Sequence, residues 1–404
     1  MRHASCVMRH ASCVMRHASC VMRHASCVMR HASCVVSGSA GTGTAFHFLP
    51  EHRLHAFGFH PWKHSVLRAY ARPAEVFFHY GFQLKHLKAL NPQRDICCVW
   101  SSHPLADKVA LFAEEQNGRC FRVEDGFLRS VGLGCLFVRP WSLVFDSCGI
   151  YYDPSKPSDL ENILQCKSFS VEELRRARRL IATVPLLGLT KYNAGSVGDF
   201  SLQVPDGRPV ILVPGQVEDD ASISCGCAEI HSNLQLLRRV RELNPSAWIL
   251  YKPHPDLQFT KKHLQIPKVA IMAFADQMVT DISISDLLPS VDSVHTMTSL
   301  TGFEALLYGK EVHCFGLPFY AGWGLTQDHT SYPQRSRRRT LEELVAAAYI
   351  DYPRYYHWGK NQPCEVEEVL LALQEQRGNF RPNWKQKMGR RLLNGFRKIR
   401  GIFA

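Results

Sequence analysis

Short apolar strand patterns alternate with helical patterns along most of the chain, and this alternation constrains the fold more than any other feature of the sequence. In the first half, strand patterns occur at 75–79, 96–100 and 120–123, with a helical pattern at about 105–116. In the second half, strand patterns occur at 210–213, 247–251, 290–294 and 312–315. Alternating strands and helices favour parallel sheets. We therefore predict an α/β protein.

The length of 404 residues is sufficient for two domains of ordinary size. The turn-rich stretch Pro205-Asp-Gly-Arg-Pro209 separates the two sets of strand patterns and is typical of a linker. The predicted organisation is a repeat and linker at 1–44, a Rossmann-like domain at 45–204, a second Rossmann-like domain at 205–330, a helical segment at 331–380 that packs back on the body, and a basic tail at 381–404.

Residues 1–35 are five perfect copies of Met-Arg-His-Ala-Ser-Cys-Val. The unit has too little apolar surface, wrongly spaced, for a coiled coil. The codons ATG CGT CAT GCG TCA TGC GTC encode it, and they are the DNA unit ATGCGTC read in successive frames. We interpret the segment as a heptanucleotide DNA repeat that makes expression phase-variable, as in bacterial genes for surface structures. We predict that it is disordered and separate from the fold.

The net charge of +12 belongs to the ends of the chain. The repeats carry five arginines and residues 381–404 carry eight lysines or arginines, with no acid in either segment. The rest of the chain therefore has a net charge of about −1. A nearly neutral body argues against nucleic-acid binding. Ten of the fifteen cysteines lie outside the repeat, and Cys225-Gly-Cys227 lacks a second ligand pair for zinc. We predict reduced cysteines, a cytoplasmic protein, and no metal or cofactor.

The stretch from Val294 to Lys310 predicts an anion site. An apolar strand pattern is followed by hydroxyl residues, among them Thr298 and Ser299, and then by a helical pattern. Backbone N–H groups and the positive end of a helix dipole suit a phosphate there. Glu304, about one turn into the helix, can accept hydrogen bonds from a ribose. The alternative is a plain capping box with Thr301 at the N-cap and Glu304 at N3.

Lys252-Pro-His-Pro-Asp256 follows the strand pattern at 247–251. Its two prolines fix the backbone around His254 at the carboxyl end of a strand, where open α/β sheets bind ligands. Lys252 and His254 can both face a phosphate, although a lone histidine after a strand is more often structural. Together with the hydroxyl-rich helix start, the motif looks like the nucleotide-binding half of a GT-B glycosyltransferase.

Carboxylates follow one strand pattern in each half. Glu124 and Asp125 end the strand at 120–123, which suits acid–base chemistry in a cleft. The alternatives are a simple Asp-Gly turn and an ion pair between Glu124 and Arg129. After the strand at 210–213 come Gln216, Glu218, Asp219 and Asp220. One of these acids is a candidate nucleophile or base, although three consecutive acids are often a solvated loop.

The stretch Pro318-Phe-Tyr-Ala-Gly-Trp-Gly-Leu325 combines aromatic residues with glycines. This composition suits a loop that closes over a sugar, with Tyr320 and Trp323 as its contacts. The alternative is a hydrophobic loop that covers the edge of the sheet.

Taken in order, the motifs resemble those of the bacterial capsule polysaccharide β-Kdo transferases, where Kdo is 3-deoxy-D-manno-octulosonic acid. The matching motifs are EDGFLRS, SLVFDSCGIYYDPSKPSDLE, KYN, VPGQVEDDAS, YKPHPD, VHTMTSLTGFEALLYG and PFYAGWGLT, within about 95–360. Capsule members of the family often carry two such modules in tandem. This chain has one, which leaves open a different acceptor or the addition of a single residue.

The resemblance implies a GT-B enzyme that transfers Kdo from CMP-β-Kdo with retention of configuration, without a metal. The family's nucleophile is the aspartate of a Gln-x-x-x-Asp-x-Ser motif, here Gln216, Asp220 and Ser222. Glu124 is the expected acid/base. The expected donor-binding residues are Lys252, His254, His295, Thr298, Ser299, Ser222 and Glu304. The expected acceptor or sugar contacts are Asp125, Arg129, Tyr320 and Trp323.

Two alternatives remain. Another CMP-releasing GT-B enzyme, a polysialyltransferase or a glycerol-phosphate polymerase, is not expected to share EDGFLRS or the nucleophile loop. In a non-catalytic capsule export or assembly factor, the cleft carboxylates would be incidental. The expected partners of the favoured enzyme are CMP-Kdo and a glycan or lipid-linked acceptor.

The tail at 381–404 has the pattern of a basic amphipathic helix. Its apolar positions are Trp384, Met388, Leu392, Phe396, Ile399 and Phe403. At roughly 1 kcal/mol per basic residue near an anionic surface, the tail can hold the protein on the inner face of the inner membrane. We expect residues 381–404 to bind anionic liposomes in a sedimentation assay and to release in high salt. The alternative is a helix docked on the first domain, in which case removing the tail leaves binding unchanged or unfolds the protein.

Overall fold

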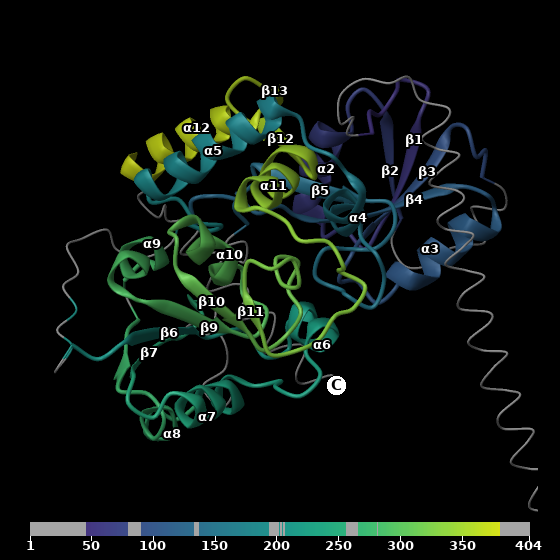
Figure 1. The fold of residues 1–404 in the computed structure, drawn as a ribbon. Helices are drawn as coiled ribbons and strands as arrows, with labels where there is room; N and C mark the ends of the chain where they lie inside the picture. Colours follow the sequence, from purple (N-terminus) through teal and green to yellow (C-terminus); the bar gives the residue numbers. More distant parts are fainter. Residues whose placement is uncertain are drawn as a thin grey trace, which may run out of the picture. The chain divides into compact units, whose positions relative to one another are not determined.

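The first of two sheets has seven strands in the order β13-β12-β5-β4-β3-β1-β2 (Figure 1). The computed structural model describes residues 46–79, 90–132, 137–193, 202, 204, 207–255, 266–280 and 282–379, and all that follows concerns these residues. The strands are β1 (Arg53–Phe57), β2 (Glu75–His79), β3 (Asp95–Trp100), β4 (Arg119–Asp125), β5 (Ser142–Asp146), β12 (Pro353–His357) and β13 (Gln362–Cys364). The predicted repeat and the predicted tail lie outside the described residues.

The first sheet is parallel from β2 to β4 and antiparallel beyond β4. Its helical elements are η1 (Pro61–Lys63), α2 (His64–Ala71), α3 (Ala106–Glu115), α4 (Asp159–Cys166) and α5 (Val171–Leu186). Cys97 and Val99 of β3 pack against Val109 and Ala113 of α3. The alternation of strands and helices predicted for the first half is therefore confirmed, except that β5 reverses direction.

The second sheet is parallel throughout, in the order β11-β10-β9-β6-β7-β8. Its strands are β6 (Val210–Pro214), β7 (Trp248–Lys252), β8 (Gln277–Met278), β9 (Ser293–Thr296), β10 (Glu311–Cys314) and β11 (Gln327–Asp328). Its helices are α6 (Ala221–Gly226), α7 (Asn233–Leu243), α8 (Lys268–Met272), α9 (Ile284–Leu287), the short η7 (Leu288–Ser290) and α10 (Leu300–Leu307).

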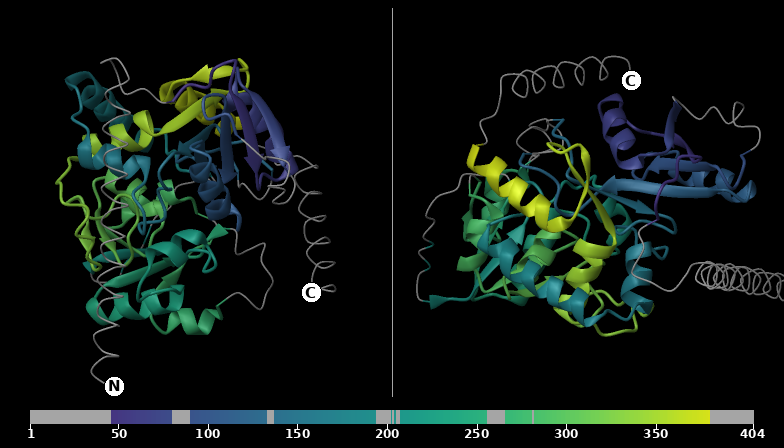
Figure 2. Two further views of the ribbon diagram at one scale, coloured as in Figure 1. Left: turned by 90° about the vertical axis from the view of Figure 1, so that its right-hand side faces the viewer. Right: turned by 90° about the horizontal axis from the view of Figure 1, so that it is seen from above.

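Helices cover both faces of the second sheet, as a parallel sheet requires (Figures 1 and 2). Along β6, Ile211 and Val213 pack in the cluster that contains α7 and α8. The intervening Leu212 packs in the cluster that contains Phe303 of α10. Successive side chains of a strand point to opposite faces, so one buried apolar strand serves both layers.

The segment at 331–380 differs from the predicted helical segment. It contains α11 (Leu341–Val345), the π-helical η8 (Ala346–Asp351) and α12 (Val366–Asn379), but also the hairpin β12–β13. β12 pairs antiparallel with β5, so the segment extends the first sheet instead of only packing on it. The physical reason is packing, since Tyr355 and Tyr356 are both buried and tyrosine is favoured in strands.

Both sheets belong to one compact unit, His47–Ala404, so the predicted division into two Rossmann-like domains near residue 205 stays a prediction. The largest core cluster joins the two sheets, since it holds Phe127 after β4, Phe303 of α10 and Tyr352 before β12. Within the described ranges, no helix is long and apolar enough to cross a membrane.

Candidate active site

A cavity of about 840 Å³ lies where the carboxyl ends of strands from both sheets meet. The first sheet contributes the end of β4, and the second contributes the loops after β6 and β7 and the start of α10. The segments 151–152, 190–192 and 318–319 also contribute to the lining. Ligands of open α/β sheets bind at such strand ends, because the connecting loops and helix N-termini gather there.

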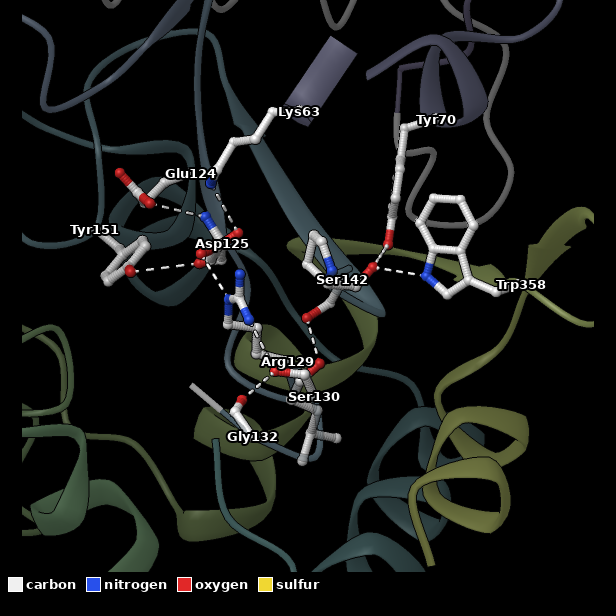
Figure 3. Close-up of polar contacts among 12 residues, drawn as sticks. Lys63, Tyr70, Glu124, Asp125, Arg129, Ser130, Gly132, Ser142, Tyr151 and Trp358 are labelled. Carbon is white, nitrogen blue, oxygen red and sulfur yellow. Dashed lines mark hydrogen bonds and ion pairs between the residues drawn. The ribbon is translucent and has the colours of Figure 1, made fainter. Parts of the chain in front are cut away.

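Glu124 and Asp125, at the end of β4, line the cavity from the side of the first sheet. Figure 3 shows Asp125 with Lys63 and Arg129 beside it. Glu124 accepts hydrogen bonds from the Ser101 hydroxyl (3.0 Å) and from the backbone N–H of Asp125 (3.0 Å). Asp125 lies between two cations, Arg129 at 2.7 Å and Lys63 at 3.3 Å. The predicted alternative, an ion pair between Glu124 and Arg129, is wrong because Arg129 pairs with Asp125 instead.

The two adjacent carboxyls have opposite pKa shifts. Burial, and then the negative charge of Asp125, raises the pKa of Glu124 to about 7. Burial by itself would also raise the pKa of Asp125, but the cations of Arg129 and Lys63 outweigh it and hold that pKa well below its usual range. Two neighbouring carboxyls with separated pKa values are the arrangement that acid–base catalysis at neutral pH requires.

Lys63 reaches Asp125 from η1, and its ammonium lies 3.1 Å from the centroid of the Trp100 ring. Its side chain is 12% exposed, so the ion pair with Asp125 is poorly screened by water. Burial lowers the pKa of Lys63. No motif in the sequence marks this residue, because the ion pair with Asp125 joins positions that are far apart in the chain.

The segment 190–193 connects the two halves of the cavity. The Lys191 backbone N–H donates to Glu304 of α10 (2.9 Å), and the Lys191 carbonyl accepts from the backbone N–H groups of Arg129 and Ser130. The Asn193 amide donates to the Ser130 carbonyl (3.1 Å). Burial raises the pKa of Glu304 to about 7. Glu304 lines the cavity, but it is not the second member of a capping box, because the N-cap of α10 is Ser299 and not Thr301.

Gln216 organises the wall on the side of the second sheet. Its side-chain amide exchanges two hydrogen bonds with Thr298, from Nε2 to Oγ1 (3.0 Å) and from the Thr298 N–H to Oε1 (2.9 Å). The Thr298 hydroxyl donates to Ser222 Oγ (3.2 Å). Since Gln216 is buried, these contacts fix the β6 loop against the start of α10. Gln216, Ser222, Thr298 and Ser299 all line the cavity.

The three consecutive acids occupy different positions. Asp219 and Asp220 line the cavity and are exposed. Asp220 is also the N-cap of α6, since its Oδ1 accepts the N–H of Ser222 (2.8 Å). Glu218 is outside the lining and accepts the backbone N–H of Asn233 at the start of α7 (2.8 Å). The structure therefore leaves two of the acids as candidates for chemistry.

Lys252 and His254 both line the cavity at the end of β7. The Lys252 ammonium donates to the Thr280 carbonyl (3.2 Å) and the residue is buried. The second sheet thus brings Lys252, His254 and the hydroxyl residues Thr298 and Ser299 to the cavity, and this set combines positive charge with hydrogen-bond donors. This combination is suited to a phosphate.

Four residues that were predicted to contact the donor, the acceptor or the sugar are too deeply buried to do so. Arg129, His295, Tyr320 and Trp323 are at most 2% exposed and are absent from the lining of the cavity. His295 lies within β9 and stacks on His313, with ring centroids 4.0 Å apart. It is a core residue, and burial lowers its pKa to about 3.

Tyr320 and Trp323 support the site from behind instead of covering a sugar. The Tyr320 hydroxyl donates to the Ser299 carbonyl at the start of α10. A side chain at Gly302 would begin 2.3 Å from that hydroxyl, which explains the glycine in the helix. The Trp323 indole N–H donates to the Phe319 carbonyl (2.8 Å). Phe319, together with Pro318, is the part of this loop that lines the cavity.

Sequence reasoning missed several lining residues, namely Tyr151, Tyr152, Thr190, Lys191, Phe127 and Phe319. Tyr152 shares a hydrogen bond with Ser101 (2.8 Å), which in turn contacts Glu124. The only signal for Tyr151, Tyr152 and Lys191 was their presence within the motifs SLVFDSCGIYYDPSKPSDLE and KYN. Their positions in the cavity depend on how loops from both halves fold together.

A family model described as "Capsule polysaccharide biosynthesis protein" matches residues 95–185 and 190–355, which is more than half of the chain. Among curated relatives, the capsule polysaccharide modification protein LipA of Neisseria meningitidis serogroup B is 42% identical over 82% of this chain and 46% of its own length. The lipopolysaccharide-processing protein LpsZ of Rhizobium meliloti is 40% identical over 78% of this chain and 73% of its own length. The chain thus spans about half the length of LipA.

Two solved structures from Thermosulfurimonas dismutans are also similar. The KpsC β-Kdo 2,4 transferase superimposes with a TM-score of 0.71 at 32% identity, over 80% of this chain and 98% of that one. The KpsC β-Kdo 2,7 transferase superimposes with a TM-score of 0.66 at 34% identity, over 81% of this chain and 100% of that one. The matches support the α/β fold.

Proposed function

The chain belongs to the capsule polysaccharide biosynthesis protein family, and from that premise we propose that it is a retaining GT-B glycosyltransferase. The donor is CMP-β-Kdo, and the acceptor is a surface glycan or a lipid-linked glycan. The sugar named for the two similar KpsC structures supports the choice of donor. The capsule and lipopolysaccharide terms in the names of LipA and LpsZ support the class of acceptor.

The observation that carries the proposal is that two groups of side chains with different chemistry line the same cavity. The first sheet presents the carboxyl pair Glu124 and Asp125, and the second presents Lys252, His254 and the hydroxyl-rich start of α10. The first set suits the activation of a hydroxyl, and the second suits a phosphate. A glycosyltransferase that uses a nucleotide sugar needs both in one place.

On the donor side, the phosphate of CMP lies against Lys252 and His254, with Thr298 and Ser299 as further donors. Charge-assisted hydrogen bonds from Lys252 and His254 stabilise the phosphate as it leaves. Glu304 accepts hydrogen bonds from the ribose. The buried exchange of hydrogen bonds between Gln216 and Thr298 supports this assignment, because it holds the hydroxyl-rich turn in a fixed orientation.

Transfer proceeds by two displacements at the anomeric carbon of Kdo. In the first, Asp220 Oδ2 attacks that carbon, the bond to the phosphate oxygen breaks, and CMP leaves with the electron pair. In the second, an acceptor hydroxyl loses its proton to Glu124 and attacks the same carbon, which releases Asp220. Two inversions give net retention. The N–H of Ser222 holds Asp220 Oδ1, which leaves Oδ2 for the attack.

Release of CMP provides the test of this function. The purified chain is incubated with CMP-Kdo, with CMP-sialic acid or with CDP-glycerol, each with and without a synthetic glycan acceptor, and CMP is quantified. We expect acceptor-dependent CMP release from CMP-Kdo alone. Release from another donor would favour a polysialyltransferase or a glycerol-phosphate polymerase, and no release from any donor would favour an assembly factor.

Replacement of His254 by alanine is expected to weaken donor binding and to slow transfer. A hydrogen bond to a charged group contributes about 1.5–3 kcal/mol, which corresponds to a loss of about ten- to a hundredfold in kcat/KM for the donor. Steady-state kinetics with calorimetry of CMP binding measure both effects. His231→Ala is the matched control, since His231 is an exposed histidine of the same half outside the cavity lining. Unchanged CMP affinity and rate would make His254 structural.

A further inference from the structure

A second cavity, of about 380 Å³, lies between α2 and the turn that joins β12 to β13. Arg68 of α2 and Arg72, just beyond the helix, both line it. Arg139, before β5, also lines it. Trp358 and Asn361 of the hairpin turn complete the wall. We refer to it as the arginine pocket.

Among the residues that the structure describes, no carboxylate pairs with the three guanidinium groups of the arginine pocket. Arg68 lies 4.9 Å from the centroid of the Phe78 ring, and Arg139 lies 5.1 Å from that of the Trp358 ring. In the described part of the chain, neither these arginines nor Arg72 forms an ion pair, and no acidic residue lines the pocket. All three arginines are exposed, so water screens their mutual repulsion, and their guanidinium groups are accessible to an anion that enters the pocket.

The pocket also presents neutral groups that suit a sugar. The Tyr356 hydroxyl accepts from Arg72 (3.4 Å) and donates to Asn361 Oδ1 (2.7 Å). This orients the Asn361 amide, whose Nδ2 can then donate to a hydroxyl of a ligand. Asn361 has a φ of +54°, a conformation that asparagine adopts more readily than most residues.

The Trp358 ring is held in place from behind. Its indole N–H donates to the Pro140 carbonyl (3.0 Å), and the Tyr70 hydroxyl donates to the same carbonyl (3.2 Å) (Figure 3). The ring itself is partly exposed and lines the pocket. A fixed, half-exposed indole offers an apolar surface to the C–H face of a sugar ring.

We propose that the arginine pocket binds an acidic sugar of the acceptor glycan. The guanidinium groups bind the carboxylate, the Asn361 amide donates a hydrogen bond to a hydroxyl, and the Trp358 ring packs against the apolar face of the sugar. The choice of a sugar acid rests on the proposed function, because a Kdo transferase produces glycans that carry carboxylates. A concave site with an amide and an aromatic wall fits a single sugar better than a flat membrane surface.

The pocket is connected to the catalytic pair through the start of β5. The backbone N–H of Trp141, next to Pro140, donates to the Arg129 carbonyl (2.7 Å). Arg129 in turn donates to Asp125 Oδ2 (2.7 Å). Figure 3 shows Arg129 and Ser142 between Asp125 and the pair Tyr70 and Trp358. The pocket therefore belongs to the half of the protein that carries the carboxyl pair, Glu124 and Asp125, and is joined to that pair by hydrogen bonds.

The test compares acceptor kinetics of the wild type with those of the double variant Arg68→Gln/Arg139→Gln. The acceptors are a synthetic Kdo-terminated oligosaccharide and its carboxyl-reduced form. For the acidic acceptor we expect KM to rise about tenfold or more, since charge-assisted hydrogen bonds are lost, with kcat and the KM for CMP-Kdo unchanged. For the carboxyl-reduced acceptor we expect equal KM values in both proteins. The control, Arg94→Gln/Lys108→Gln, removes two positive charges from exposed positions outside both cavities.

Calorimetry without CMP-Kdo separates this inference from the proposed function. If the wild type binds the acidic oligosaccharide and the double variant does not, the pocket is an acidic-sugar site even if no Kdo transfer is found. If transfer occurs and both acceptors behave alike in wild type and variant, the inference is wrong and the proposed function stands. If the double variant loses binding to inorganic phosphate or to phosphatidylglycerol vesicles but binds the oligosaccharide as the wild type does, the inference is also wrong.

Discussion

Replacement of Asp220 by alanine is expected to lower the rate of Kdo transfer by at least about a thousandfold, while CMP still binds with unchanged affinity. The reason is the division of roles in the cavity. Asp220 acts on the anomeric carbon, whereas the phosphate is held by Lys252 and His254 at the end of β7. Acceptor-dependent CMP release and calorimetry of CMP binding measure the two quantities separately.

Asp220 also caps α6, so the alanine variant loses a cap as well as a nucleophile. Loss of an N-cap costs about 1 kcal/mol of stability. Asp220→Asn keeps the cap, because the asparagine oxygen can accept the same N–H, and it is expected to be equally inactive. Asp219→Asn is the matched control, since Asp219 lines the same cavity, is also exposed and has no proposed role. Normal transfer by Asp220→Asn, or a Kdo adduct trapped on another residue, would contradict the assignment.

The elements that sequence reasoning located best are those with a strong local pattern. The strand at 210–213 appears as β6, and the helical pattern after Ser299 appears as α10. β6 is a continuous apolar run, as a strand buried on both faces of a parallel sheet must be, and α10 carries Phe303, Ala305, Leu306 and Leu307 at helical spacing. Because the sequence pattern located the strands, it also located the residues that follow their carboxyl ends. Glu124, Asp220 and Lys252 consequently line one cavity, as the order of elements predicts.

Residues that do not follow directly after a predicted strand were misplaced or missed. Tyr320 and Trp323 stand among glycines, a composition shared by mobile covers and by buried loops, and their burial follows from packing that has no local signature. Lys191 reaches the cavity through contacts with Glu304 and Arg129, from positions distant in the chain. The hairpin at Pro353–Cys364 was concealed for the same reason, since its strand pairs with β5.

Replacement of Glu124 by glutamine is expected to lower transfer by about a hundred- to ten-thousandfold, which is the contribution of a general base. The wild type should also show a pH dependence with a midpoint near 7, because the folded-state pKa of Glu124 is about 7. A base acts only when deprotonated. The kcat/KM for the acceptor should therefore fall as the pH falls below about 7, approaching tenfold per pH unit, and level off above it. In the glutamine variant this dependence should disappear.

The same variant distinguishes a base from a residue that merely supports the fold. If Glu124 acts only on the acceptor hydroxyl, CMP release in the first displacement survives, and a Kdo adduct accumulates on the protein, where mass spectrometry detects it. Glu304→Gln is the matched control, because Glu304 lines the same cavity and burial raises its pKa to about 7 as well. That variant should raise the KM for CMP-Kdo and keep the pH midpoint of kcat/KM for the acceptor. If the midpoint of the pH dependence stays near 7 in Glu124→Gln and shifts in Glu304→Gln, Glu304 is the base and Glu124 is not.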